Sequence, residues 1–451
     1  MSATQVAGVA AQVTAFARDL RWADLPAPVQ RRLALLLLDL AAVSEAGRGA
    51  PAALIAADHA SEAHGGDAAT SLLDGRRLSL PGAAWANGVL ANVLDFDDGH
   101  RITKGHPGAM VIPAALAAAE SVGASATEFL EAVLVGYEVA IRAGILLHER
   151  EEQYHASAAW GSLGVAAATG RLLGLDARRF RHAIGIAEYH APIALMPRAV
   201  ADPAMTKDTC GWGGLIGTSA ALLARGGFTA LDSEFMLAAD ELELGERWEV
   251  LEVYLKHYPC CRWSQPGIDA ALRLNVDPTR IEAVVVRTFA AADLLSSRRP
   301  TNTEEMQYSL VWPIATALAR GRFGVDEVLG GFDDPLVASI AARIRVEVDA
   351  ELTEAFPARR LAAVEVVTSD GETARSGLTE AEGEPHSAGW ENVVADKVLR
   401  FLDADAALPV AALPKPPVAG VSGRSRDQLV HLLAFVLDDA EPRPHERGRP
   451  G

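Results

Sequence analysis

The sequence has few cysteines, only three among 451 residues, and two of them, Cys260 and Cys261, are adjacent. Adjacent cysteines have a poor geometry for bridging each other, and three cannot form a disulfide framework in so long a chain. Residues 1–20 also lack the basic start, the apolar stretch and the small-residue cleavage site of a signal peptide. We therefore expect a protein of the reducing cytoplasm.

Positive charge and long apolar runs are scarce as well. The chain has 41 lysines and arginines against 59 aspartates and glutamates, a net charge of -18, so nucleic acid and anionic membranes are not attracted to it. Its longest apolar run, Leu33–Leu38, is followed by Asp39 and is far shorter than the roughly 20 residues that span a bilayer. We expect neither partner, and a small anionic substrate would need a local basic pocket.

Several motifs of cofactor chemistry are missing. The sequence contains no G-x-G-x-x-G between a strand and a helix, no Walker-type G-x-x-x-x-G-K-[ST] and no G-x-S-x-G nucleophile elbow. It also lacks a helical H-x-x-x-H or E-x-x-H pair that would mark a metal site. These absences favour an enzyme that uses histidine, lysine and aspartate side chains, with no metal, nucleotide or flavin cofactor.

Helical patterns fill the first part of the chain, from about residue 5 to about 257. The run Ala109–Val122 follows Pro107 and is ended by Gly123, and Ser125 with Glu128 forms a capping box for the next helix. Similar signals predict helices near 28–45, 83–95, 129–147, 156–174, 177–190 and 211–225.

The pattern changes after about residue 258. Ile281–Arg287 and Ile344–Val348 are rich in β-branched residues, and Asp370-Gly371 predicts a tight hairpin turn. Helical patterns return from about 388, at Trp390–Leu402 and Arg424–Leu437. The predicted fold is mainly α with a smaller α+β domain. We expect a helical domain at residues 1–257 and an α+β lid domain at residues 258–387. Helices at residues 388–440 are expected to pack back on the first domain, and residues 441–451 to form a disordered tail.

The densest polar cluster in an apolar region is Asp95-Phe96-Asp97-Asp98-Gly99-His100, followed by Lys104 and His106. Carboxylates, imidazoles and cations so close together are suited to tuned acid and base groups. The alternative interpretations are a solvated loop whose aspartates cap helices, and a metal site.

Three further residues are candidates. His155 precedes a small-residue helix, where the helix dipole favours its neutral form, although a helix-capping role fits equally well. Lys207 precedes the glycine-rich stretch 211–214, and its position before a helix is by itself more typical of a surface lysine. Arg262 is flanked by residues that are usually buried.

Together these segments resemble the MmgE/PrpD family, which includes 2-methylcitrate dehydratase, cis-aconitate decarboxylase and iminodisuccinate epimerase. The resemblance extends over most of the chain and rests on the order and spacing of short motifs: Ala86-Asn87-Gly88, Asp95-Phe96-Asp97-Asp98, Gly105-His106-Pro107, Gly136-Tyr137-Glu138, Tyr154-His155, Lys207, Gly227-Phe228-Thr229, Tyr258-Pro259-Cys260-Cys261-Arg262 and Gln307-Tyr308-Ser309-Leu310. It implies a large helical domain built from N- and C-terminal segments, an inserted α+β lid, a homodimer and no required cofactor.

The resemblance implies that the residues of the family's polar pocket correspond to Asp95, His106, His155, Lys207 and Arg262 of this sequence. The chain departs from the family pattern in three places, with Gly99 where threonine is frequent, Val311-Trp312 where Pro-Tyr is frequent, and Cys210–Gly213 where His-x-Gly is common. The aromatic hydroxyl assigned to catalysis in the decarboxylase is therefore missing, and a different substrate is expected.

The expected function is dehydration of a small hydroxylated carboxylic acid through proton abstraction beside a carboxylate or carbonyl. Lys207 and Arg262 would hold substrate carboxylates, with His100 and Lys104 as further substrate-binding candidates. His155 or His106 would be the base, the other histidine would donate the proton, and Asp95 would orient a histidine. The alternatives are an epimerase or decarboxylase using the same site, and an inactive binding protein that retains the fold.

Overall fold

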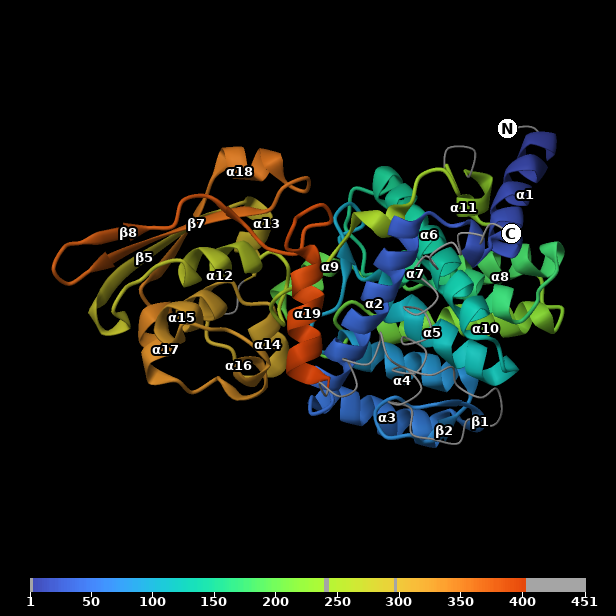
Figure 1. Ribbon diagram of the computed structural model, residues 1–451, viewed down its shortest axis with the longest axis horizontal. Coiled ribbons are helices and arrows are strands. Elements are labelled where there is room, and N and C mark those ends of the chain that lie inside the picture. The colour runs from blue at the N-terminus through green and yellow to red at the C-terminus, as the bar shows by residue number, and fades with distance from the viewer. Residues whose placement is uncertain (1–2, 239–242, 296–297, 403–451) are drawn as a thin grey trace, which may run out of the picture.

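The computed structural model describes residues 3–238, 243–295 and 298–402, and the side chains from residue 10 onward. Figure 1 shows a helical part on one side of the molecule and a sheet with short helices on the other. This arrangement confirms the predicted mainly α fold with a smaller α+β part. No described helix is both long enough and apolar enough to cross a bilayer.

The helical part contains α1 to α11, and seven of these helices lie within three residues of a predicted range at each end, whereas no separate range was predicted for α1, α3, α9 and α11. Helix α5 starts at Pro107 and ends before Gly123, which has a left-handed φ of 67°. Ser125 and Glu128 form the predicted capping box at the start of α6. The bounds are α1 Ala3–Asp19, α2 Ala27–Ala46, α3 Pro51–Ala63, α4 Leu80–Asn92, α5 Pro107–Val122, α6 Ala126–Arg150, α7 Ala158–Leu172, α8 Ala177–His190, α9 Met196–Ala201, α10 Cys210–Arg225 and α11 Glu234–Leu237.

Small residues let the central helices approach closely. A Cβ atom at Gly164 of α7 would lie 2.3 Å from the backbone oxygen of Gly136 on α6. These helices and α5 form one apolar core that is rich in alanine, and protein cores are close-packed. Ligands are therefore expected at the ends of the helices, where loops meet, and not between them.

The sheet of the second part has the strand order β6-β5-β7-β8, with β9 also paired to β7. Strand β5 runs parallel to β6 and antiparallel to β7, and Val284 lies opposite Val366. The predicted hairpin joins β7 to β8, with Gly371 at a φ of 82°. The strands are β5 Ile281–Thr288, β6 Ile344–Val348, β7 Leu361–Thr368, β8 Thr373–Arg375 and β9 Thr379–Glu380.

Short helices surround this sheet, and two small ribbons lie in the helical part. The helices are α12 Gln265–Leu272, α13 Ala290–Asp293, α14 Thr303–Gln307, α15 Val311–Arg320, α16 Val325–Gly330, α17 Pro335–Ala341 and α18 Ala350–Ala355. The ribbons pair β1 Gly65–Thr70 with β2 Arg77–Leu78, and β3 Gly99–His100 with β4 Val253–Tyr254.

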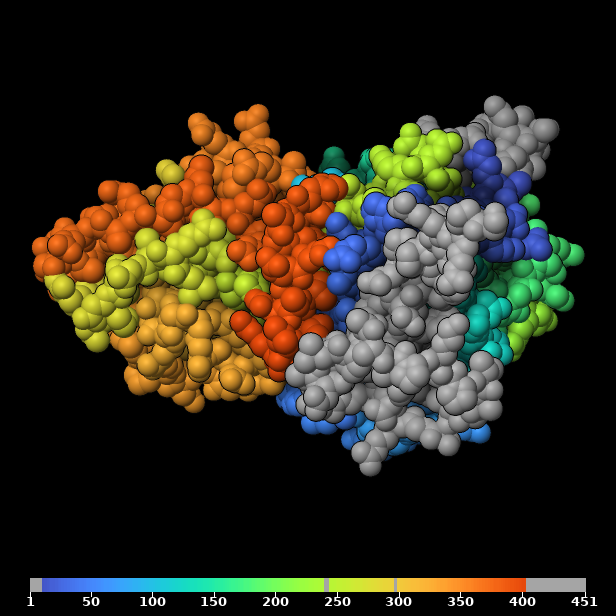
Figure 2. Space-filling view, in the orientation of Figure 1, coloured from blue at the N-terminus to red at the C-terminus, as the bar shows by residue number. Residues whose placement is uncertain are grey.

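Helix α19, Trp390–Phe401, returns from the sheet and packs against α2 (Figures 1 and 2). The buried Lys397 ammonium lies 2.7 Å from an Asp39 carboxylate oxygen, and it also donates to the Phe96 carbonyl at 2.8 Å. The chain after β9 is therefore tied to the helical part, beside the predicted polar cluster. The second predicted C-terminal helix, 424–437, and the tail 441–451 lie outside the described residues, and the predicted domain boundaries stay predictions.

Candidate active site

A small cavity lies where loops of the helical part meet residues from the second part. It has a volume of about 30 Å³, room for roughly one water molecule. Its lining is unusually rich in ionisable groups, and consists of Asp95, Lys104, His106, Tyr154, Met196, Val200, Asp208, Tyr254, Lys256, Cys261, Arg262, Trp263, Tyr308 and Arg360.

His106 is the centre of this cluster, at the residue that precedes α5. Its Nδ1 atom lies 3.0 Å from Asp97 Oδ2, and its Nε2 atom lies 3.3 Å from Asp95 Oδ1 and 3.6 Å from Asp208 Oδ1. All four side chains are buried. Asp97 is itself oriented by the Asn92 amide, which donates to Asp97 Oδ1 at 3.0 Å.

Carboxylates decide the protonation of His106. Burial alone lowers the pKa of the imidazole, but Asp97 and then Asp208 outweigh burial and the nearby Lys256 and raise that pKa to about 9. Burial raises the pKa of the Asp97 carboxyl. The positive charges of His106, Lys256 and Lys207 outweigh burial and lower that pKa to about 2. His106 is therefore an imidazolium at neutral pH, a proton donor held in a fixed orientation.

Asp95 has one occupied and one open oxygen. Its Oδ1 atom accepts a hydrogen bond of 2.6 Å from the Lys256 ammonium, whereas its buried Oδ2 atom has no hydrogen-bond partner among the described residues. Burial lowers the pKa of Lys256, but Asp95 and other anions raise it above its ordinary value, so the ammonium stays charged. Asp95 thus has one carboxylate oxygen without a hydrogen-bond partner among the described residues, on a side chain that lies next to two cations.

Backbone strain is concentrated around the same residues. Asp95, Lys104, Lys207 and Thr209 have φ values of 51°, 52°, 37° and 60°, in the left-handed region that residues other than glycine seldom adopt. Such conformations persist only where the surrounding structure enforces them, and they are frequent at functional sites.

Lys207 and Arg262 are buried, but their polar atoms are largely occupied. The Lys207 ammonium donates to the Asn92 carbonyl and to Gln307 Oε1, both at 2.6 Å, and Lys207 is not part of the cavity lining. Arg262 lines the cavity, yet it donates to backbone carbonyls of Leu255, Ala381 and Glu382 and to two side chains. Their hydrogen bonds join chain segments that are far apart in the sequence.

The other candidates take different places. Lys104 lines the cavity, with its ammonium 5.2 Å from the centre of the Tyr154 ring. His100 and His155 are buried but do not line the cavity. His100 lies 3.3 Å from Glu249, and His155 is stacked on His148 with ring centres 6.3 Å apart. The structure therefore brings Asp95, Lys104, His106 and Arg262 together in one cavity lining, which does not include His100, His155 or Lys207.

Sequence reasoning assigned no role to several residues of the cavity. Lys256 and Asp208 contribute charge, Tyr308 donates to Asp208 Oδ2 at 2.9 Å, and Tyr254 and Arg360 complete the lining. Tyr308 belongs to the motif Gln307-Tyr308-Ser309-Leu310. Lys256 is 161 positions from its partner Asp95, so no local pattern indicated a role for Lys256.

Asp95, Asp97 and His106 bring oxygen and nitrogen atoms within 4.8 Å of one another, a spacing that could hold a metal ion. The Lys256 ammonium is already bound to Asp95 Oδ1, and the two ring nitrogens of His106 face carboxylate oxygens. Side chains therefore supply the positive charge that balances these carboxylates.

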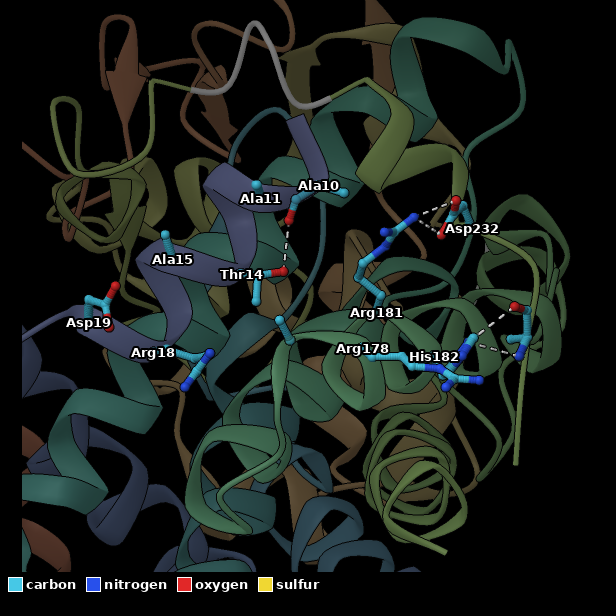
Figure 3. A pocket seen from close by; sticks show the side chains of 12 residues that line it. Ala10, Ala11, Thr14, Ala15, Arg18, Asp19, Arg178, Arg181, His182 and Asp232 are labelled. Atoms are coloured by element: carbon cyan, nitrogen blue, oxygen red, sulfur yellow. Dashed lines mark hydrogen bonds and ion pairs between the residues drawn. The ribbon is translucent and has the colours of Figure 1, made fainter. Parts of the chain in front are cut away.

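A second, wider depression of about 750 Å³ lies between α1 and α8 (Figure 3). Its Arg181 is paired with Asp232 at 2.7 Å, and the backbone N–H of Ala230 donates to its His182 Nδ1 at 3.2 Å. The residues that line it include no histidine–carboxylate pair, so the small cavity has the stronger case for catalysis.

Comparisons with known proteins agree with the resemblance. A family model described as the MmgE/PrpD N-terminal domain matches residues 11–241, and one described as the MmgE/PrpD C-terminal domain matches residues 258–406.

Curated relatives are matched over part of their length. A cis-aconitate decarboxylase-like protein of Aspergillus oryzae is 30% identical over 41% of this chain and 40% of its own length. The cis-aconitate decarboxylase of Aspergillus terreus is 26% identical over 59% of this chain and 60% of its own length. That of Homo sapiens is 38% identical over 26% of this chain and 25% of its own length. The match thus covers less than two thirds of each of these relatives.

Proposed function

The chain belongs to the MmgE/PrpD family, and from this premise we propose that it is a lyase that dehydrates a small hydroxylated carboxylic acid without a cofactor. One observation carries the proposal. An imidazolium, His106, and a carboxylate with an open oxygen, Asp95, line the same buried cavity beside the Lys256 ammonium. Such a set can remove one proton and supply another within a single substrate.

The acid–base step uses Asp95 and His106. Asp95 Oδ2 takes the proton from the carbon next to the substrate carboxylate, and the electron pair of that C–H bond forms the C=C bond. The C–O bond of the neighbouring carbon breaks, and the hydroxyl leaves as water with the proton from His106 Nε2. Exchange with solvent then returns a proton from Asp95 to the imidazole, which restores both groups.

Cations stabilise the charge that develops during this step. Removal of the proton places negative charge on the substrate carboxylate, and fixed positive groups in a buried cavity lower the energy of that state. Lys256 is next to Asp95, and Lys104 and Arg360 line the same cavity. Lys207, which is outside the cavity lining, donates hydrogen bonds to Asn92 and Gln307 and contributes its charge from there. A role for His155 stays a prediction.

Decarboxylation is the second candidate, because the curated relatives named above are cis-aconitate decarboxylases or resemble them. Trp312 stands where the family has an aromatic hydroxyl, and its Nε1 atom donates to the Gly331 carbonyl outside the cavity. The phenol that does line the cavity is Tyr308. The missing hydroxyl makes dehydration the preferred reaction. An epimerase would return the proton to the opposite face of the same carbon.

Product analysis separates these reactions. Citrate, malate and tartrate are incubated with the protein in deuterated water and followed by proton NMR and ultraviolet absorbance. Dehydration gives a conjugated double bond, epimerisation only replaces one C–H by deuterium, and decarboxylation releases carbon dioxide. We expect the first, and we expect its loss in His106→Gln and its retention in His190→Gln, which alters an exposed histidine. Activity in His106→Gln equal to wild type would contradict the site.

Two further properties belong to this proposal. We infer a homodimer of the cytoplasm, as the family resemblance implies, and light scattering of the purified protein tests the dimer. Binding of an acid without any turnover would favour the alternative of an inactive protein that retains the fold.

A further inference from the structure

Gly99 and Tyr254 lie opposite each other in the short ribbon formed by β3 and β4. A Cβ atom at Gly99 would lie 2.4 Å from both Cζ and Oη of Tyr254, and 2.8 Å from its Cε2. The φ of Gly99 is outside the left-handed region, so its backbone does not require glycine. Glycine is needed here for space, because the Tyr254 ring fills the place of a side chain at position 99.

Two arginine side chains lie close to the ring of Tyr254. The ring is buried and lines the cavity. The Arg262 guanidinium lies 5.1 Å from the ring centre and that of Arg360 lies 4.8 Å from it. A cation is attracted to the face of an aromatic ring, so the two guanidinium groups favour the present position of the Tyr254 ring. The ring therefore cannot move aside cheaply to admit a side chain at position 99.

The hydroxyl of Tyr254 is available to a ligand. Among the described residues it has no hydrogen-bond partner, although buried tyrosine hydroxyls usually find one. Burial raises the pKa of this phenol despite the opposing effect of Arg360, so the hydroxyl keeps its proton. Nε of the buried Arg360 is also without a hydrogen-bond partner in the described part of the chain. Two donors without partners thus belong to neighbouring residues of the cavity lining.

We propose that Tyr254, admitted by Gly99, is a specificity-determining residue of this cavity, whose hydroxyl donates to an anionic oxygen of the substrate beside Arg360. The inference rests on the proposed function, since it takes the cavity next to His106 as the substrate site. The Tyr254 hydroxyl adds a hydrogen-bond donor next to Arg360, and the Tyr254 ring limits the size of the substrate group that fits there.

A thermodynamic cycle tests the spatial part without any ligand. We expect Gly99→Ala to lower the melting temperature in the wild-type background and to leave it nearly unchanged in the Tyr254→Ala background, where the clashing ring is gone. Gly49→Ala is the matched control, because a Cβ there meets nothing within 4 Å. Equal effects of Gly99→Ala in both backgrounds would overturn the pairing.

Binding tests the functional part. The affinities of citrate, malate and succinate are measured by calorimetry for wild type, Tyr254→Phe and the double variant Gly99→Ala/Tyr254→Ala. We expect Tyr254→Phe, which keeps the ring, to weaken binding roughly tenfold, as loss of one hydrogen bond to a charged group does. The double variant should change the order of preference toward the larger acid. Tyr189→Phe, at an exposed tyrosine, should change nothing.

The outcomes separate the two proposals. If wild type binds an acid and Tyr254→Phe binds it equally well, the role of Tyr254 is overturned and the proposed function stands. If wild type binds none of the acids, the proposed function fails and this inference fails with it.

Discussion

The Nδ1 atom of His106 lies 3.0 Å from the Oδ2 atom of Asp97, and both side chains are buried where α5 begins. The start of a helix disfavours a cation, because the helix dipole is positive there. The carboxylates outweigh both the dipole and burial, so His106 keeps its proton at neutral pH with a pKa of about 9. Several consequences of this pair can be measured.

Asp97→Asn keeps the shape of the side chain and removes its charge. Without the Asp97 carboxylate, burial lowers the pKa of His106, and we expect the alkaline limb of the kcat/KM profile to move down from about pH 9 by roughly one pH unit or more. The profile is measured against that of Asp176→Asn, a change at a surface helix cap. An unmoved limb would show that Asp97 does not control the proton donor.

His106 also links stability to pH. Its folded pKa is raised from 6.5 to about 9, so its contribution is fully present below pH 6.5 and is lost as pH rises through 9. At 1.36 kcal/mol per pH unit this contribution is on the order of 3 kcal/mol. Urea unfolding of wild type at pH 6 and pH 10 should show the loss, and His106→Gln should not. Parallel curves for the two proteins would contradict the link.

Lys256→Met leaves Asp95 buried without its cation. We expect kcat/KM to fall by roughly a hundredfold or more, as for other lost charge-stabilising groups, and the melting temperature to fall because one partner of a buried pair remains alone. Steady-state kinetics and calorimetry measure both. Lys207→Met is the comparison, because it removes a buried cation outside the cavity lining, and it should lower kcat/KM less than Lys256→Met does.

Lys397 and Asp39 form a buried pair that ties α19 to α2. Lys397→Met or Asp39→Leu alone should reduce the free energy of unfolding by about 3–5 kcal/mol, whereas the double variant should be close to wild type. The double variant still loses the bond to the Phe96 carbonyl, between Asp95 and Asp97, so its kcat should fall while it remains folded. Unfolding curves with kinetics test both, and wild-type kcat in the double variant would rule out a positioning role.

The sequence by itself determined the local structure and the site neighbourhood. The capping box at Ser125, the start of α5 at Pro107 and the hairpin at Gly371 depend on residues within a few positions of one another, so local patterns specify them. The cluster from Asp95 to His106 was also evident, because it is dense polarity in an apolar region.

Tertiary structure decided which groups meet. Asp97, and not Asp95, binds His106 Nδ1, and Lys256 reaches Asp95 across 161 positions. Arg262, which the sequence marked as a substrate ligand, is largely occupied by the backbone of residues 381 and 382. These partners are set by how helices, loops and sheet pack against one another. That packing brings together residues that are far apart in the chain. Local periodicity indicates only the direction of a side chain within its own helix or strand, so it does not predict these contacts.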